Sequence, residues 1–105
     1  MTAKRGKSRM AKIIRESAGD DVYEYYPLGR YVVRAVGVCG GRPTFKHTRI
    51  EIAGTLDRLA HGESVEELVE GYEGRVPREA IIEAIELVTQ QFISNLPHLS
   101  VLEPA

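Results

Sequence analysis

Three cations follow a glycine-rich loop in the middle of the sequence, and they are the side chains best suited to binding chemistry. Arg42, Lys46 and Arg49 lie in the stretch 38–52, VCGGRPTFKHTRIEI, with no acid between them. A guanidinium donates two parallel hydrogen bonds to a carboxylate or a phosphate. The stretch therefore predicts contact with an anionic partner, either a nucleic acid or the carboxylates of another protein.

A second group of cations lies at the N-terminus, where residues 1–15 hold six Lys or Arg before the first acid, Glu16. Such an arm is suited to non-specific contact with phosphates, which weakens steeply as the salt concentration rises. The alternative is a solvated tail that keeps the chain soluble. The candidate nucleic-acid or partner contacts are Lys4, Arg5, Lys7, Arg9, Lys12, Arg42, Lys46 and Arg49.

The formal net charge of −1 hides a strong segregation of charge along the chain. Residues 1–50 hold 11 Lys or Arg against 4 acids, a formal charge of +7, and residues 51–105 hold 3 against 11, a formal charge of −8. Asymmetry of this size favours an anionic partner for the basic half. The alternative is that the two halves attract each other within or between subunits.

The sequence contains no recognisable catalytic, cofactor or metal site. No paired carboxylates or triad stand out, and no phosphate-loop fingerprint accompanies the glycines. The single cysteine, Cys39, and the three histidines fit no usual spacing of metal ligands. No apolar run is long enough to span a membrane, and the basic leader lacks a signal core. We therefore expect a non-enzymatic cytoplasmic protein without a cofactor.

The elements that must position the cations are predicted to begin with strands. Residues 1–20 form the basic arm, in which apolar spacing favours a short helix over residues 9–18. Residues 22–36 alternate around a Pro-Leu-Gly turn, which is typical of a β-hairpin. An isolated hairpin is only marginally stable, so it must gain a strand from residues 44–50 or from a second subunit. The glycine-rich loop and basic run occupy residues 37–51.

Residues 52–93 are predicted to form three helices. An apolar stripe starts at Ile52, Ser64 begins the second helix through a capping box with Glu67, and Pro77 suits the first turn of the third. The tight glycine-containing turn between the last two helices is typical of a helix-turn-helix. The apolar face of the third helix is predicted to be buried and consists of Ile81, Ala84, Ile85, Val88 and Phe92.

Three segments in this order carry a family resemblance: the loop VCGGRPTFKHTRI, the helix IAGTLDRLAHGES and the segment SVEELVEGYEGRVPREAIIEAIELV. Over residues 35–92 the chain resembles the bacterial family catalogued as domain of unknown function 433. That family reads glycine-glycine-x-proline, then glycine-threonine-arginine-isoleucine, then a helix ending in glycine-glutamate-serine before a helix-turn-helix pair. This chain departs from the pattern at His47, where the family has glycine. The resemblance implies an antitoxin that partners a nuclease of the PIN-like class.

The predicted helix-turn-helix is poorly suited to reading DNA. Its second helix would carry Glu79, Glu83 and Glu86 outward, and phosphates repel carboxylates. Any binding to DNA is therefore expected from the cations. A toxin could be held by Arg42 or Arg49, or by the proline-bounded tail of residues 94–105. The apolar side chains of that tail are Leu96, Leu99, Val101 and Leu102.

The sequence as a whole predicts an α+β, mainly α fold. Residues 21–93 form one domain, a three-helix, helix-turn-helix-like bundle with an N-terminal hairpin, and the protein is expected to form a homodimer. We expect an antitoxin-like protein that binds and neutralises a PIN-like nuclease; whether it also binds its own promoter DNA is left open. The alternatives are a stand-alone DNA-binding regulator that uses the basic arm, and an oligomeric protein-interaction scaffold.

Overall fold

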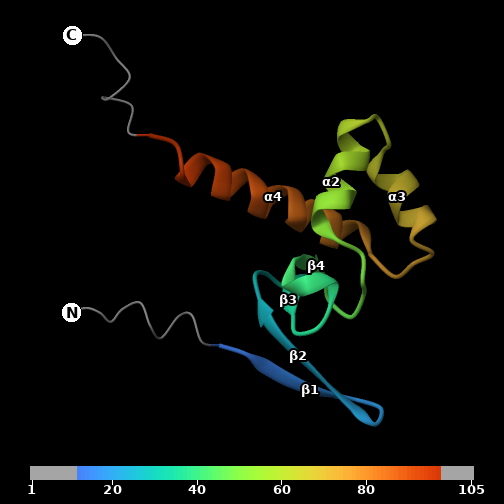
Figure 1. Cartoon of the computed structure of the whole chain (residues 1–105). Helices are drawn as coiled ribbons and strands as arrows, with labels where there is room; N and C mark the ends of the chain where they lie inside the picture. Colours follow the sequence, from blue (N-terminus) through green and yellow to red (C-terminus); the bar gives the residue numbers. More distant parts are fainter. Residues whose placement is uncertain (1–11, 98–105) are drawn as a thin grey trace.

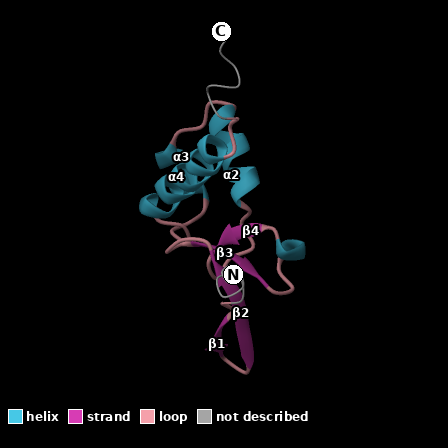
Figure 2. Cartoon of the chain, turned by 90° about the vertical axis from the view of Figure 1, so that its left-hand side faces the viewer, coloured by secondary structure: helices cyan, strands magenta, loops and turns pink. Residues whose placement is uncertain are grey.

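The computed structural model describes residues 12–97, which fold as an antiparallel sheet followed by three helices. The helices gather at one end of the molecule and the sheet at the other, and α4 extends away from the remaining helices (Figures 1 and 2). The elements in chain order are β1 (Ile14–Ala18), β2 (Asp21–Pro27), β3 (Val32–Ala35), η1 (Cys39–Gly41), β4 (Pro43–Phe45), α2 (Ile52–Ala60), α3 (Val65–Gly71) and α4 (Arg78–Ser94).

The predicted hairpin is confirmed as strands β2 and β3. Their register pairs Tyr25 with Ala35, and the backbone N–H groups of Leu28 and Gly29 both donate to the carbonyl of Val32 across the turn. The hairpin is stabilised by a strand on each side, because β1 pairs with β2 and β4 pairs with β3. Strand β4 comes from the basic run, as expected, but β1 does not.

The helix predicted over residues 9–18 is wrong in its described part, because Ile14–Ala18 is the edge strand β1. A two-residue turn, Gly19–Asp20, joins β1 to β2, and its φ of 66° at Gly19 matches the type II′ turns that close hairpins. The backbone of β1 pairs with that of β2, so it satisfies the hydrogen-bonding groups along one edge of β2. A helix of only one or two turns is marginally stable by itself, and the strand pairing is therefore favoured over the helix that the apolar spacing predicts.

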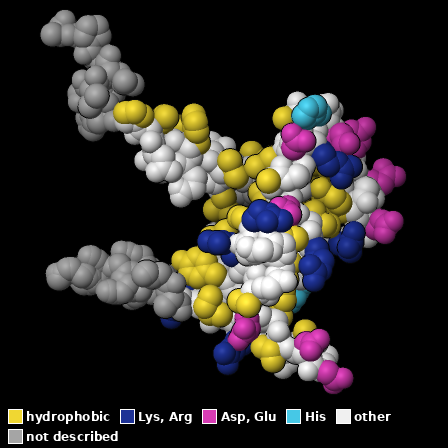
Figure 3. Space-filling view, in the orientation of Figure 1, with side chains coloured by type: hydrophobic (Ala, Val, Ile, Leu, Met, Phe, Trp, Pro, Cys, Tyr) yellow, Lys and Arg dark blue, Asp and Glu magenta, His cyan; other side chains and the backbone are white. Residues whose placement is uncertain are grey.

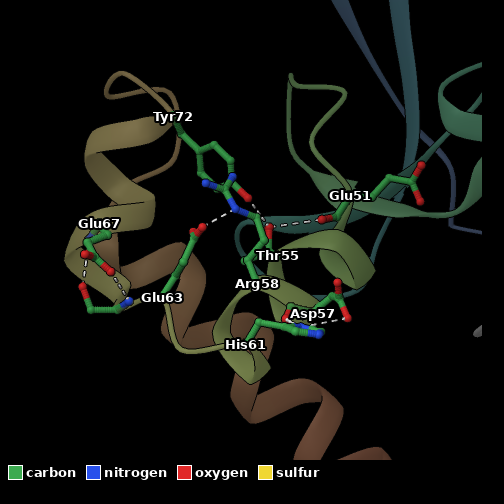
Figure 4. Close-up of polar contacts among 9 residues, drawn as sticks. Glu51, Thr55, Asp57, Arg58, His61, Glu63, Glu67 and Tyr72 are labelled. Carbon is green, nitrogen blue, oxygen red and sulfur yellow. Dashed lines mark hydrogen bonds and ion pairs between the residues drawn. The ribbon is translucent and has the colours of Figure 1, made fainter.

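The three helices lie where the sequence places them. Ser64 accepts from the N–H of Glu67 at 3.0 Å while the Glu67 carboxylate accepts from the N–H of Ser64 at 2.8 Å, so the predicted capping box is present. Figure 4 shows this box beside the polar contacts that join α2 to the end of α3. There the buried hydroxyl groups of Thr55 and Tyr72 lie 2.8 Å apart, and Thr55 donates to the carbonyl of Glu51.

The main core lies between the sheet and the helices. It combines residues of β3 and β4 with all three helices: Val32, Phe45, Ile52, Leu68, Tyr72, Val76, Ala80, Ile81 and Ala84. A second, smaller cluster of Tyr25, Val33 and Ala35 covers the opposite face of the sheet. The sheet therefore has two packed faces near β3, and β3 is its most buried strand.

The expectation of a mainly α fold is wrong. Helices make up 42% and strands 23% of the described residues, so the sheet is a principal layer and not an appendage. The reason is that residues 14–18, expected in the basic arm, pair with the hairpin in addition to β4, so that the two strands of the hairpin become four. Strand pairing between distant segments leaves little local signature in a sequence.

Glu83 does not form part of a solvated acidic face, which corrects the expectation for α4. Its carboxylate accepts three backbone hydrogen bonds from the β2–β3 turn: from Arg30 at 2.7 Å, Tyr31 at 2.7 Å and Val32 at 3.1 Å. A Cβ at Gly29 would lie 2.7 Å from the carboxylate carbon, so only glycine permits this approach. Glu79 and Glu86 are exposed, as expected.

Only the first half of the predicted apolar face of α4 is buried. Ile81 and Ala84 are buried and Ile85 is partly buried against the core, whereas Val88 is 43% exposed and Phe92 is 66% exposed. The helix is longer than the body that covers it, so its C-terminal half extends beyond the sheet and the other helices (Figure 1).

Candidate functional site

Residues 45–50, which belong to the family-like motif, form a tight turn between β4 and α2. We call it the Arg49 turn, after the exposed arginine that it carries. The N–H of Phe45 donates to the carbonyl of Ile50 at 3.0 Å, which closes the turn. Inside it the Thr48 hydroxyl donates to the carbonyl of Phe45 at 2.8 Å and accepts from the N–H of Ile50 at 3.0 Å. The threonine side chain thus fixes both sides of the turn, and Arg49 lies exposed at its outer edge.

His47 adopts the left-handed backbone conformation, with a φ of 65°. This conformation costs a non-glycine residue roughly 1–2 kcal/mol, which explains physically why the family motif has glycine here. The imidazole makes compensating contacts: its ring lies 4.5 Å from that of Tyr23, and Nε2 lies 3.2 Å from the Glu16 carboxylate. The Tyr23 hydroxyl also accepts from the N–H of His47 at 2.9 Å.

The glycine-rich loop supports the same turn from the other side. The thiol of Cys39 in η1 donates to the carbonyl of Arg49 at 3.4 Å, and Cys39 itself has a φ of 49°. Arg34 of β3 reaches this loop, donating from Nε to the carbonyl of Gly41. The turn is therefore held by β2, by η1 and by its own threonine, which fixes the position of Arg49 relative to the sheet.

Arg42 is engaged within the chain by an ion pair. Its Nε and Nη2 atoms donate to the two carboxylate oxygens of Glu51 at 2.9 and 3.0 Å, a bidentate pair. The hydrogen bond from Arg42 lowers the pKa of the Glu51 carboxyl, and the same bond raises the pKa of the guanidinium. Glu51 thus occupies two of the five N–H donors of Arg42 and neutralises its charge, although the side chain is 62% exposed.

Lys46 belongs to a polar and aromatic cluster on the sheet. Its ammonium lies 3.2 Å from the Glu16 carboxylate and 4.8 Å from the centroid of the Tyr25 ring. The Tyr25 hydroxyl donates to Glu16 at 2.7 Å, and this bond, followed by the contact with Lys46, lowers the pKa of the Glu16 carboxyl. Contact with the Tyr25 hydroxyl, and then with Glu16, raises the pKa of Lys46.

Arg49 differs from Arg42 and Lys46 in having no acidic neighbour within residues 12–97. Its side chain is exposed, and the hydrogen bond found for this residue uses its backbone carbonyl. Of the three cations that the sequence placed in the basic run, Arg49 is the one whose guanidinium is available to an external carboxylate or phosphate.

The remaining predicted contact residues are only partly covered by the structure. Lys12 and Leu96 are both exposed, the latter at 49%. The others lie outside the described residues: Lys4, Arg5, Lys7, Arg9, Leu99, Val101 and Leu102.

Two residues of the Arg49 turn's support were missed from the sequence. Glu16 falls within the predicted basic arm, and Tyr23 falls within the predicted hairpin, with no role expected for either side chain in a site. Their roles depend on β1 pairing with β2, which brings Glu16 opposite Tyr23. The alternation of Tyr23 and Tyr25 on one face was the signal that could have identified this side of the sheet.

The described part of the chain has no group of three or more His, Cys, Asp or Glu side chains arranged to hold a metal ion. Between residues 12 and 97, none of the helices has the length and apolar character required to cross a membrane.

Comparison with known proteins identifies a family but no characterised relative. The family model described as "Protein of unknown function (DUF433)" matches residues 32–87, which is more than half of the 105 residues. The match begins at β3 and ends within α4, so it includes the Arg49 turn. No curated protein and no solved structure matches the chain.

Proposed function

Because the chain belongs to the DUF433 family of proteins of unknown function, we propose that it is an antitoxin-like protein that binds and neutralises a PIN-like nuclease through the Arg49 turn. The resemblance noted from the sequence supplies the antitoxin role as a hypothesis. The availability of Arg49, on a turn fixed by Thr48 and Cys39, is the observation that supports this surface as the point of contact.

The proposed mechanism is occupation of the nuclease site without any reaction. A guanidinium has five N–H donors in a planar fork and binds a carboxylate through two parallel hydrogen bonds. Inserted among the metal-binding carboxylates of a nuclease, Arg49 would neutralise the charge that holds the metal ions. The rigid turn supports this role because little side-chain and loop freedom is lost when a preorganised surface binds.

The apolar tail named from the sequence supplies a second contact in this proposal. Leu96 is exposed at the end of α4 and begins the apolar series that continues through the tail. An extended apolar segment beside a specific ion pair would add buried area to the complex, since charged groups give specificity more than affinity.

The test is inhibition of a purified PIN-like nuclease encoded beside the gene for this chain. The full chain should inhibit cleavage of RNA, Arg49→Ala should weaken inhibition about 30-fold or more, and Arg49→Lys should restore only part of it because lysine lacks the planar fork. Arg42→Ala is the matched control, since Arg42 is already paired with Glu51.

Two outcomes would count against the proposal. Inhibition that is equal for the native chain and Arg49→Ala would move the contact away from the turn. Absence of inhibition, together with salt-sensitive binding of the full chain to duplex DNA, would favour the DNA-binding regulator instead.

A further inference from the structure

The apolar stripe of α4 continues beyond the part of the helix that the body covers. Ala84 is buried, and the same helix face then carries Val88 and Phe92, each four residues after the last, while Leu96 follows just beyond the C-terminal end of the helix. These three side chains are 43%, 66% and 49% exposed. Figure 3 shows hydrophobic side chains along this protruding half of α4. A stripe that begins in the core and ends in solvent lacks a cover for its second half.

A groove lies directly beside this exposed ridge, between α4 and the β2–β3 turn. Val88 and Gln91 line the groove, and Phe92, the next residue of α4, stands on the exposed ridge beside it. Groove and ridge therefore lie within one turn of the same helix. The residues that form the groove include Leu28, Pro43, Ile52, Leu87, Val88 and Gln91.

We propose that the C-terminal half of α4 is a homodimer interface, in which Phe92 of each chain enters the groove of the other. The ridge and the groove lie side by side on one helix. A two-fold axis near Gln91 therefore places the ridge of each chain in the groove of the other. The two α4 helices then cross in antiparallel fashion. Such an interface is isologous, because the same patch serves both subunits.

The absence of charge favours a second copy as the occupant. From Leu87 to Pro97 the chain has no charged side chain, and the residues that line the groove are also uncharged. Residues close to a two-fold axis lie near their own copies, so a charged patch at the axis would meet like charge. Acidic side chains lie over α2 and α3 and at the sheet end of the molecule, and none is visible on the protruding half of α4 (Figure 3). This inference does not rest on nuclease binding.

Sedimentation equilibrium of the full chain over a wide concentration range tests the interface. The native chain should dimerise, and Phe92→Asp should raise the dissociation constant about 30-fold or more, because it places a charge at the centre of the contact. Gln90→Asp is the matched control, since it adds the same charge on the opposite side of α4 and should leave the dimer intact.

Cross-linking gives a second measurement that does not depend on a destabilising change. In a Cys39→Ser background, Gln91→Cys should form a covalent dimer on oxidation because it lies at the axis, whereas Gln90→Cys should not. A native chain that stays monomeric at all concentrations would overturn the proposal. So would a dimer that is equally stable with Phe92→Asp, or one that cross-links through both positions equally.

Discussion

Two buried threonines have opposite environments, although both are fully inaccessible to solvent. The hydroxyl of Thr55 lies 2.8 Å from that of Tyr72, whereas the hydroxyl of Thr44 has no hydrogen-bond partner among residues 12–97. An unsatisfied buried hydroxyl costs free energy, and valine has the same shape without it. We expect Thr44→Val to raise the free energy of unfolding by about 1 kcal/mol and Thr55→Val to lower it by about 1–2 kcal/mol. Chemical denaturation checks both, and a change of the same sign in the two variants would contradict the assignment.

The left-handed backbone of His47 can be separated from its side-chain contacts by two substitutions. His47→Ala and His47→Gly both remove the imidazole from Tyr23 and Glu16, but only alanine keeps the steric strain at a φ of 65°. The glycine variant should therefore be more stable than the alanine variant by about 1 kcal/mol. Thermal unfolding of the pair measures the difference. Equal stabilities would mean that the turn relaxes when the ring is removed.

Glu16 should make the stability of the sheet sensitive to acid. The Tyr25 hydroxyl and Lys46 lower its pKa below the ordinary value of 4.5, so the ionised carboxylate stabilises the fold above that pH. This contribution is lost as the pH falls through the lowered pKa of the folded state. The native chain should melt at a higher temperature than Glu16→Gln at pH 7, and the difference should shrink below pH 4.5. A difference that persists unchanged in acid would assign the effect to packing.

At the scale of elements, the contact between Glu83 and the β2–β3 turn connects α4 to the sheet most directly. The Glu83 carboxylate accepts hydrogen bonds from the backbone N–H groups of Arg30, Tyr31 and Val32. Glu83→Ala should lower the free energy of unfolding by about 2–3 kcal/mol, because these donors lose a charged acceptor. Glu86→Ala is the control, because Glu86 lies about one turn later in α4, is exposed to solvent and makes no such contacts within residues 12–97. Denaturant unfolding of both variants would show whether the loss is specific to Glu83.

The elements that could be predicted from the sequence are those with local signals. The capping box of Ser64 and Glu67, and the Pro-Leu-Gly turn of the hairpin, depend on residues a few positions apart. The pairing of β1 with β2, and the contact of Glu83 with the β2–β3 turn, cannot be predicted in the same way. Each depends on a partner that the spacing of residues along the sequence does not reveal. The candidate site divides in the same way. The basic run was recognisable, but the choice of Arg49 over Arg42 required knowing that Arg42 faces Glu51.

At the scale of the whole molecule, the proposed dimer predicts that thermal stability depends on concentration. If unfolding separates two chains, mass action raises the melting temperature as the protein concentration rises. For two chains of this length the expected rise is about 3 °C for each tenfold increase in concentration. Phe92→Asp should remove this dependence while Gln90→Asp keeps it. Differential scanning calorimetry across two decades of concentration measures both.

The charge segregation of the sequence is partly neutralised within the folded chain. Lys46 and Arg15 on the sheet are paired with Glu16 and Glu24, which belong to the same basic half. Arg58 and Arg78 in the acidic half are likewise paired with Glu63 and Glu66. Among the Lys and Arg ion pairs of residues 12–97, only that of Arg42 with Glu51 joins the two halves, so most of this pairing takes place within each half.

The contact made by Glu83 also bears on how the protein is made. Arg30 and Glu83 are separated by 53 positions in the chain. A ribosome adds roughly 5–20 residues each second, so roughly 3–10 s pass between the synthesis of the turn and that of its acceptor. During that interval the sheet lacks both the carboxylate and the helices that cover Val32 and Phe45. The nascent N-terminal half is thus exposed to proteases and chaperones for a time set by the speed of translation.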